Sequence, residues 1–80
     1  MRCFEVSRLG STLQVAVRPE GLGKADQIAD AVERSTDESV DVVRLTGSVL
    51  DEPGRGLTAL LRRVSDIAAR RGKRFQVGPI

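Results

Sequence analysis

The acidic and hydroxyl side chains between residues 46 and 57 are the part of this sequence best suited to chemistry or recognition. The segment places Ser48, Asp51 and Glu52 among glycines and reads TGSVLDEPGRGL. Two carboxylates can share general acid–base work only when both face the same reacting group. Asp51 and Glu52 are adjacent, so on a helix their side chains diverge by about 100°. The segment therefore favours binding over catalysis.

The composition excludes most other kinds of active site. The chain has no His and a single Cys, which excludes zinc sites, His-based triads and disulfide frameworks. Asp26, Asp30 and Glu33 fall on one face of a predicted helix, a pattern typical of a solvated polar stripe rather than of a metal site. Two Phe are the only aromatic residues, too few for a platform that stacks single-stranded nucleic acid. We expect no catalytic residue, no metal and no cofactor.

Charge is distributed unevenly along the 80 residues. Residues 1–53 hold six Lys or Arg and ten Asp or Glu, whereas residues 54–80 hold seven Lys or Arg and one acid, Asp66. A basic C-terminal third can attract phosphate or an acidic partner. The simpler interpretation is a solvated helix face. No helix-turn-helix pattern accompanies these cations, so we do not expect nucleic acid as the partner. The outward stripe would consist of Arg62, Arg63, Arg70 and Arg71.

No segment predicts a membrane or secretory protein. No apolar run approaches the roughly 20 residues that a membrane span needs. The N-terminal sequence MRCFE places a glutamate where a secretory signal requires an apolar core. We therefore expect a cytoplasmic protein that does not enter a membrane.

The elements that must position the 46–57 segment follow from hydrophobic periodicity. Leu13, Val15 and Val17 alternate with less apolar neighbours, which is typical of a strand with one buried face. A short turn at residues 9–11 precedes this strand and predicts an antiparallel hairpin. The predicted strands cover residues 3–8, 12–18, 40–46 and 74–77. The predicted helices cover residues 24–35 and 54–71, with loops over 19–23 and 36–39.

This order predicts an α/β fold in one domain, residues 1–80, with the element sequence β-β-α-β-α-β. Strands joined through helices should be parallel with right-handed crossovers, so both helices pack on one face of a small, four-stranded mixed sheet. Gly72 follows the second predicted helix, at the position where a left-handed backbone is easiest for glycine. The sheet's other face would be partly wet or covered by a partner.

The 46–57 segment then lies where the third strand meets the second helix. Partners of open α/β sheets gather at the carboxyl ends of parallel strands. Asp51 is placed to be the N-cap of the second helix, with Glu52 and Pro53 in its first turn. A well-capped turn without a wider role is the alternative interpretation of the same residues.

Three stretches carry a resemblance to a known family. Residues 42–45 read VVRL, residues 50–61 read LDEPGRGLTALL, and residues 71–78 read RGKRFQVG. Together they resemble the STAS domain of anti-sigma factor antagonists, and the order of elements agrees. The resemblance implies a STAS-like fold and a protein partner, an anti-sigma factor that is also a kinase. In that family a Asp-Ser-Ser-Gly motif follows the strand, and its first Ser is the phosphorylation target.

This chain departs from the family motif at its centre. Asp51 and Gly54 match it, but Glu52 stands at the phosphorylated Ser and Pro53 at the second Ser. A carboxylate at position 52 supplies one fixed negative charge, less than the −1.5 to −2 of a phosphate, and the usual switch cannot operate there. The resemblance implies a bacterial transcription regulator that acts through protein–protein interaction. The partner-binding residues that we expect are Ser48, Asp51, Glu52, Pro53, Gly54, Gly56 and Leu57.

Two alternatives stay open. Residues 13–47, which include VAVRPE and DVVRLTG, resemble the opening of the enoyl-CoA hydratase (crotonase) family, whose next loop supplies oxyanion-hole N–H groups. That family's catalytic Glu positions have no counterpart in this chain, so the alternative is a truncated, acyl-CoA-related domain. The other alternative is a structural homo-oligomeric subunit. We expect an uncovered sheet edge after the fourth strand, which favours self-association or a partner.

Overall fold

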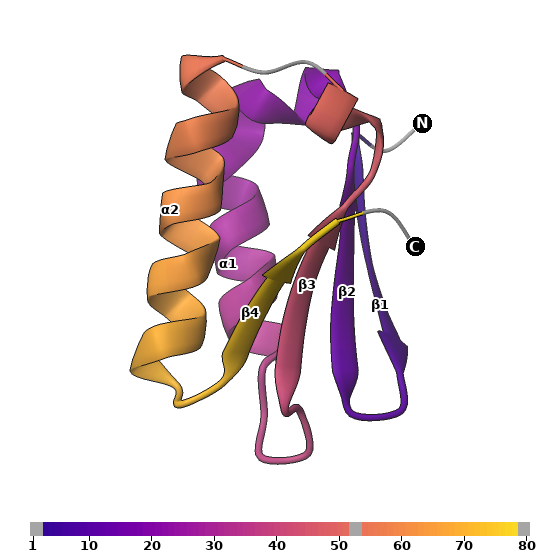
Figure 1. Ribbon diagram of the computed structural model, residues 1–80, viewed down its shortest axis with the longest axis vertical. Helices are drawn as coiled ribbons and strands as arrows, with labels where there is room; N and C mark the ends of the chain where they lie inside the picture. Colours follow the sequence, from indigo (N-terminus) through magenta and orange to yellow (C-terminus); the bar gives the residue numbers. More distant parts are fainter. Residues whose placement is uncertain (1–2, 52–53, 79–80) are drawn as a thin grey trace.

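The computed structural model describes residues 3–51 and 54–78, and these form the predicted α/β fold (Figure 1). The order of strands and α-helices is β-β-α-β-α-β, as the sequence predicts. Short 3-10 helices lie within two of the connections. The strands are β1 (Phe4–Leu9), β2 (Thr12–Val17), β3 (Val42–Thr46) and β4 (Arg74–Val77). The helices are α1 (Ala25–Ser35) and α2 (Arg55–Arg70), and the 3-10 helices are η1 (Pro19–Lys24) and η2 (Ser48–Asp51).

The four strands form one mixed sheet in the order β1-β2-β3-β4. β1 and β2 pair antiparallel, with Leu9 opposite Thr12 across a two-residue loop. In that loop Gly10 has a φ of 61° and Ser11 a negative φ, the combination found in a type II′ hairpin turn. β2, β3 and β4 are mutually parallel. Each parallel connection passes through a helix, so the predicted mixed sheet is confirmed.

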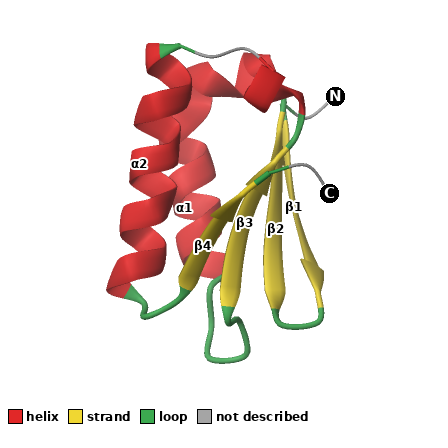
Figure 2. Cartoon of the chain, in the orientation of Figure 1, coloured by secondary structure: helices red, strands yellow, loops and turns green. Residues whose placement is uncertain are grey.

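Both α-helices cover the same face of the sheet (Figure 2). This follows from the strand order, because two right-handed crossovers that step in the same direction along a sheet place their helices on one side. The core lies between the helices and the alternate strand residues that point towards them. Burial of these apolar side chains is the main force that holds the layers together. The largest fully buried side chains are Leu13, Val15, Val17, Ile28, Val32, Val40, Val43, Leu45, Val49, Leu60 and Val64.

The second face of the sheet is covered by no helix of the described chain (Figure 1). Strand side chains alternate between faces, so residues one step from the core strand positions lie on this open face. Arg44 of β3 and Gln76 of β4 are neighbours there, and Arg44 Nη2 donates to Gln76 Oε1 at 2.9 Å. The open face is therefore largely polar, as expected for a sheet side that meets water or a partner.

Several boundaries differ from those predicted. β3 begins at Val42 rather than at residue 40, because the Val40 N–H donates to Asp37 O at 3.1 Å and the Asp41 N–H donates to Ser11 O at 2.8 Å. These bonds belong to the connection and not to the ladder. The predicted loop at 19–23 is the 3-10 helix η1, in which Pro19 at the first position pre-sets the backbone. α2 ends as predicted, with Gly72 at a φ of 70°.

Candidate interaction site

The predicted site segment leaves the end of β3 and leads into α2. η2 occupies its first part, beside η1, at the end of the sheet where β2 and β3 finish (Figure 1). Ser48 and Asp51 in η2 and Gly54 before α2 are exposed. Glu52 and Pro53, the two predicted residues that differ most from the family motif, lie outside the described residues. The structure thus brings the described polar members of the segment to the carboxyl ends of parallel strands, as the sequence predicts.

Gly47 fixes how the segment leaves the sheet. Its φ is +110°, and a Cβ on it would lie 2.4 Å from the carbonyl oxygen of Val17 and 2.6 Å from the nitrogen of Val17. The backbone at the end of β3 therefore packs directly against the backbone at the end of β2. Only glycine has both the required conformation and the required space. This contact turns the chain into η2 and sets the position of Ser48.

The predicted N-cap role of Asp51 is wrong. α2 begins at Arg55, its N-cap is Gly54, and no side chain caps it. The physical reason is the η2 turn, in which the Leu50 N–H donates to Gly47 O at 3.2 Å and takes up residues 48–51 before the helix begins. Instead, the Thr58 N–H and the Thr58 hydroxyl both donate to Gly54 O, at 3.1 and 3.2 Å. Asp51 is left exposed, with its carboxylate outside the helix.

Leu57 also departs from its predicted role as a contact residue. Its side chain is 8% exposed and belongs to the core cluster, so it is not available to a partner. Gly56 is exposed, and a Cβ on it would lie 3.4 Å from Leu22 Cδ1 of η1. A Cβ there would thus make ordinary van der Waals contact with η1, so the packing of α2 against η1 leaves room for a side chain at this position. Of the predicted contact residues that the structure describes, four are therefore exposed to a partner: Ser48, Asp51, Gly54 and Gly56.

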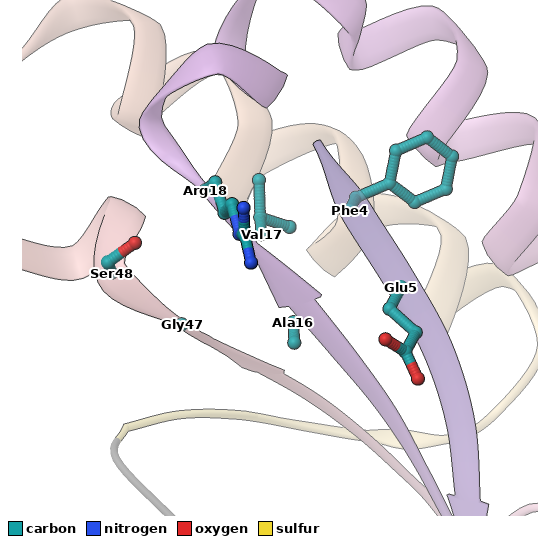
Figure 3. Close-up of a pocket in the computed structure, with 7 residues that line it drawn as sticks. All are labelled: Phe4, Glu5, Ala16, Val17, Arg18, Gly47 and Ser48. Atoms are coloured by element: carbon teal, nitrogen blue, oxygen red, sulfur yellow. The ribbon is translucent and has the colours of Figure 1, made fainter. Parts of the chain in front are cut away.

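A shallow hollow of about 240 Å³ lies next to this segment (Figure 3). Glu5 and Ala16 face each other across the hairpin register, Arg18 follows β2, and Ser48 follows the Gly47 contact. The hollow is lined by the Glu5 carboxylate, the Arg18 guanidinium and the Ser48 hydroxyl. A nucleophile, its base and an oxyanion hole are not assembled among these residues. Its lining residues are Phe4, Glu5, Ala16, Val17, Arg18, Gly47 and Ser48.

Glu5 and Arg18 were missed by sequence reasoning as members of the site. Arg18 could have been predicted, because it directly follows the second strand and partners gather at the carboxyl ends of parallel strands. We applied that rule only to the third strand. Glu5 has no such signal, because its place depends on the hairpin register that pairs it with Ala16. A one-residue change of that register would turn its side chain to the other face.

Three of the four arginines that were predicted to form the outward stripe lie against acidic residues of α1. Asp26 of α1 pairs with Arg63 of α2, and Glu33 of α1 lies 3.8 Å from both Arg70 and Arg71. The acidic residues of α1 are therefore partners for arginines and not only a solvated stripe. Among residues 3–51 and 54–78, no group of three or more His, Cys, Asp or Glu side chains is arranged to hold a metal ion.

The pKa of Asp37 is clearly shifted from its ordinary value. Asp37 accepts hydrogen bonds from the Ser39 hydroxyl and from the Ser39 N–H, the latter at 2.9 Å. These bonds, helped by the Arg8 guanidinium at 3.4 Å, hold the pKa of Asp37 below its ordinary value. Asp37 follows α1, at the end of the molecule that the β1–β2 hairpin loop occupies, so this shift belongs to the fold and not to the candidate site.

In the described part of the chain, no helix is both long and apolar enough to cross a membrane. No family model matches this chain, and no curated protein matches it either.

Proposed function

We propose that this protein is a non-catalytic, STAS-like interaction module that acts in the cytoplasm and binds an anti-sigma factor of the kinase type. Its contact surface would be the segment from Gly47 to Gly54 together with the exposed start of α2. The observation that carries the proposal is the exposure of Ser48, Asp51 and Gly54 at the carboxyl end of β3. In the family that the sequence resembles, the switch motif occupies this place between strand and helix.

Glu52 would give this module a fixed charge in place of a reversible one. In the resembled family, phosphorylation of a Ser at this position adds a charge of −1.5 to −2 and changes the binding of the partner. A glutamate carries one negative charge near neutral pH without needing a kinase. We infer that the module stays in one binding state, in which position 52 tunes affinity but does not respond to a kinase.

The test is capture of a partner from the native host with the wild type, Glu52→Ser and Glu52→Lys. Glu38→Lys is the matched control, because Glu38 is an exposed acid in the loop between α1 and β3, away from the candidate site. We expect capture of a protein with a histidine-kinase-type ATP-binding domain, with an affinity that changes at position 52 and not at position 38.

Two other outcomes would replace this proposal. Capture of further copies of the chain alone, insensitive to position 52, would favour a structural homo-oligomeric subunit. Binding of acyl-CoA by the purified protein, without a protein partner, would favour the crotonase-related alternative.

A further inference from the structure

The five arginines between positions 55 and 71 divide into two groups by what they contact. Arg63, Arg70 and Arg71 turn towards α1 and pair with its acidic residues. Arg55 and Arg62 form no ion pair with any residue in the ranges 3–51 and 54–78, and both are exposed. The first group contributes to helix–helix packing, whereas the fold gives the second group no such task.

Arg55 and Arg62 lie on the face of α2 that points away from the core. At 100° per residue, Arg55, Ala59, Arg62 and Asp66 fall within about 60° of one another. They lie opposite the buried stripe that contains Leu57, Leu60, Val64, Ile67 and Ala68. We call these four residues the outer stripe. Figure 1 shows α2 as the outermost element on its side of the molecule, so the outer stripe is accessible along its length.

The outer stripe is hollowed between its two arginines. Gly54, Arg55, Thr58, Ala59 and Arg62 line an open, shallow depression of about 510 Å³. The small residues Gly54, Thr58 and Ala59 leave this space open. The Thr58 hydroxyl does not point into it, because it donates a hydrogen bond to Gly54 O. Small residues at a helix surface allow another backbone to approach closely, so the depression suits a second helix with the two guanidinium groups beside it.

We propose that the outer stripe of α2 is the docking surface for an acidic α-helix of the protein partner. Arg55 and Arg62 are two helical turns apart, about 10.5 Å along the axis, so two carboxylates spaced by two turns on the partner helix match them. Asp66, one turn further on, disfavours a third carboxylate and favours a cation there. The inference rests on the proposed function, because both treat the chain as an interaction module, and it adds the chemistry and shape of the partner.

The test uses a defined probe and no host partner. The probe is an alanine-rich helical peptide with two glutamates two turns apart and a lysine one turn beyond the second. The control peptide carries lysines and a glutamate at these places. Purified protein comprising residues 1–80, labelled with ¹⁵N, is titrated with each peptide at low salt, and chemical-shift changes are followed for residues 54–66. The variant is Arg55→Glu with Arg62→Glu. The control variant is Lys24→Glu with Arg74→Glu, which has the same net charge and alters two other exposed cations.

We expect the wild type and the control variant to bind the acidic peptide with shifts along the outer stripe. The Arg55→Glu/Arg62→Glu variant should bind it about tenfold more weakly, because two exposed charge pairs become repulsive. The control peptide should not bind. Thermal unfolding of both variants should stay within about 3 °C of the wild type, because all four positions are on the surface.

Four results would overturn the inference. These are no binding of the acidic peptide, equal binding by both variants, tighter binding of a duplex DNA or of phosphatidylglycerol vesicles through the same residues, and self-association that only the Arg55→Glu/Arg62→Glu variant loses. Failure of the Glu52 capture experiment would remove the proposed partner but leave this titration interpretable, so the two failures are distinguishable.

Discussion

At the scale of single residues, Gly47 is the position on which the geometry of the candidate site depends most. It combines a positive φ with backbone of Val17 where its own side chain would be. Gly23 in η1 offers a matched control, because its φ lies outside the left-handed region and a Cβ there would meet nothing within 4 Å. The same chemical change at these two glycines therefore separates the requirement for glycine from the general effect of adding a methyl group.

We expect Gly47→Ala to lower the free energy of unfolding by about 3 kcal/mol, from backbone strain and from overpacking against β2. Gly23→Ala should change it by less than about 1 kcal/mol, in the stabilising direction, because alanine restricts the unfolded chain. Urea unfolding of both variants measures the two values. Equal effects at the two positions would contradict the close approach of β2 and β3.

The second prediction at this scale concerns Asp37 and the dependence of stability on pH. Because its folded-state pKa is lowered by Ser39, Asp37 contributes stability that is fully present above the ordinary Asp pKa of about 3.9. This contribution is lost as the pH falls through the lowered pKa of the folded state. Ser39→Ala should therefore reduce the loss of stability on acidification. The measurement is the urea midpoint between about pH 5 and pH 2, with Ser7→Ala on exposed β1 as the control.

At the scale of elements, the ion pairs between α1 and α2 set the mutual position of the helices only weakly. The side chains of Arg63 and Asp26 are 47% and 87% exposed, so water and salt screen their attraction. A double-mutant cycle of Asp26→Ala and Arg63→Ala should give a coupling of about 0.2–1 kcal/mol that falls as NaCl rises. The Asp30–Arg34 pair within α1 is the control for a pair that joins no elements. A coupling that salt leaves unchanged would mean that this pair is effectively buried.

The helices were the elements that sequence predicted best. Both have an apolar stripe with the period of an α-helix, and burial of that stripe decides where the helix runs. Gly72 marked the end of α2 correctly, because the Lys73 N–H donates to Ala68 O at 2.8 Å and the Gly72 N–H to Ala69 O at 3.1 Å. This pair of bonds is the Schellman motif, which needs a left-handed residue.

Sequence predicted the start of α2 less well. Asp51 has the preferred chemistry of an N-cap, but chemistry alone does not show that Gly47 turns the chain into a 3-10 helix first. That turn arises from contact with Val17, which is distant in sequence. Likewise, the pairing of α2 arginines with Asp26 and Glu33 required the helix packing to be known. The location of the candidate site followed from local patterns, whereas its composition depended on tertiary contacts.

At the scale of the whole molecule, a small core holds one helical layer against a sheet whose other face is open. For 80 residues, typical stabilities are about 4–12 kcal/mol. A single large cavity in the core can therefore remove much of the stability, whereas the open face and the hairpin loop contribute little. This contrast separates the residues that maintain the fold from those that remain available to a partner.

Leu60→Ala and Leu9→Ala test that contrast with one chemical change. Leu60 is fully buried between α2 and the sheet, and Leu9 at the end of β1 is 60% exposed. We expect Leu60→Ala to cost about 2–5 kcal/mol, because it removes buried methyl groups and leaves a cavity, and Leu9→Ala to cost less than about 1 kcal/mol. Urea unfolding followed by circular dichroism measures both. If Leu9→Ala lowered the free energy of unfolding as much as Leu60→Ala, Leu9 would be buried in solution by a second molecule on the open face. The loss of unfolding free energy caused by Leu9→Ala would then rise with protein concentration.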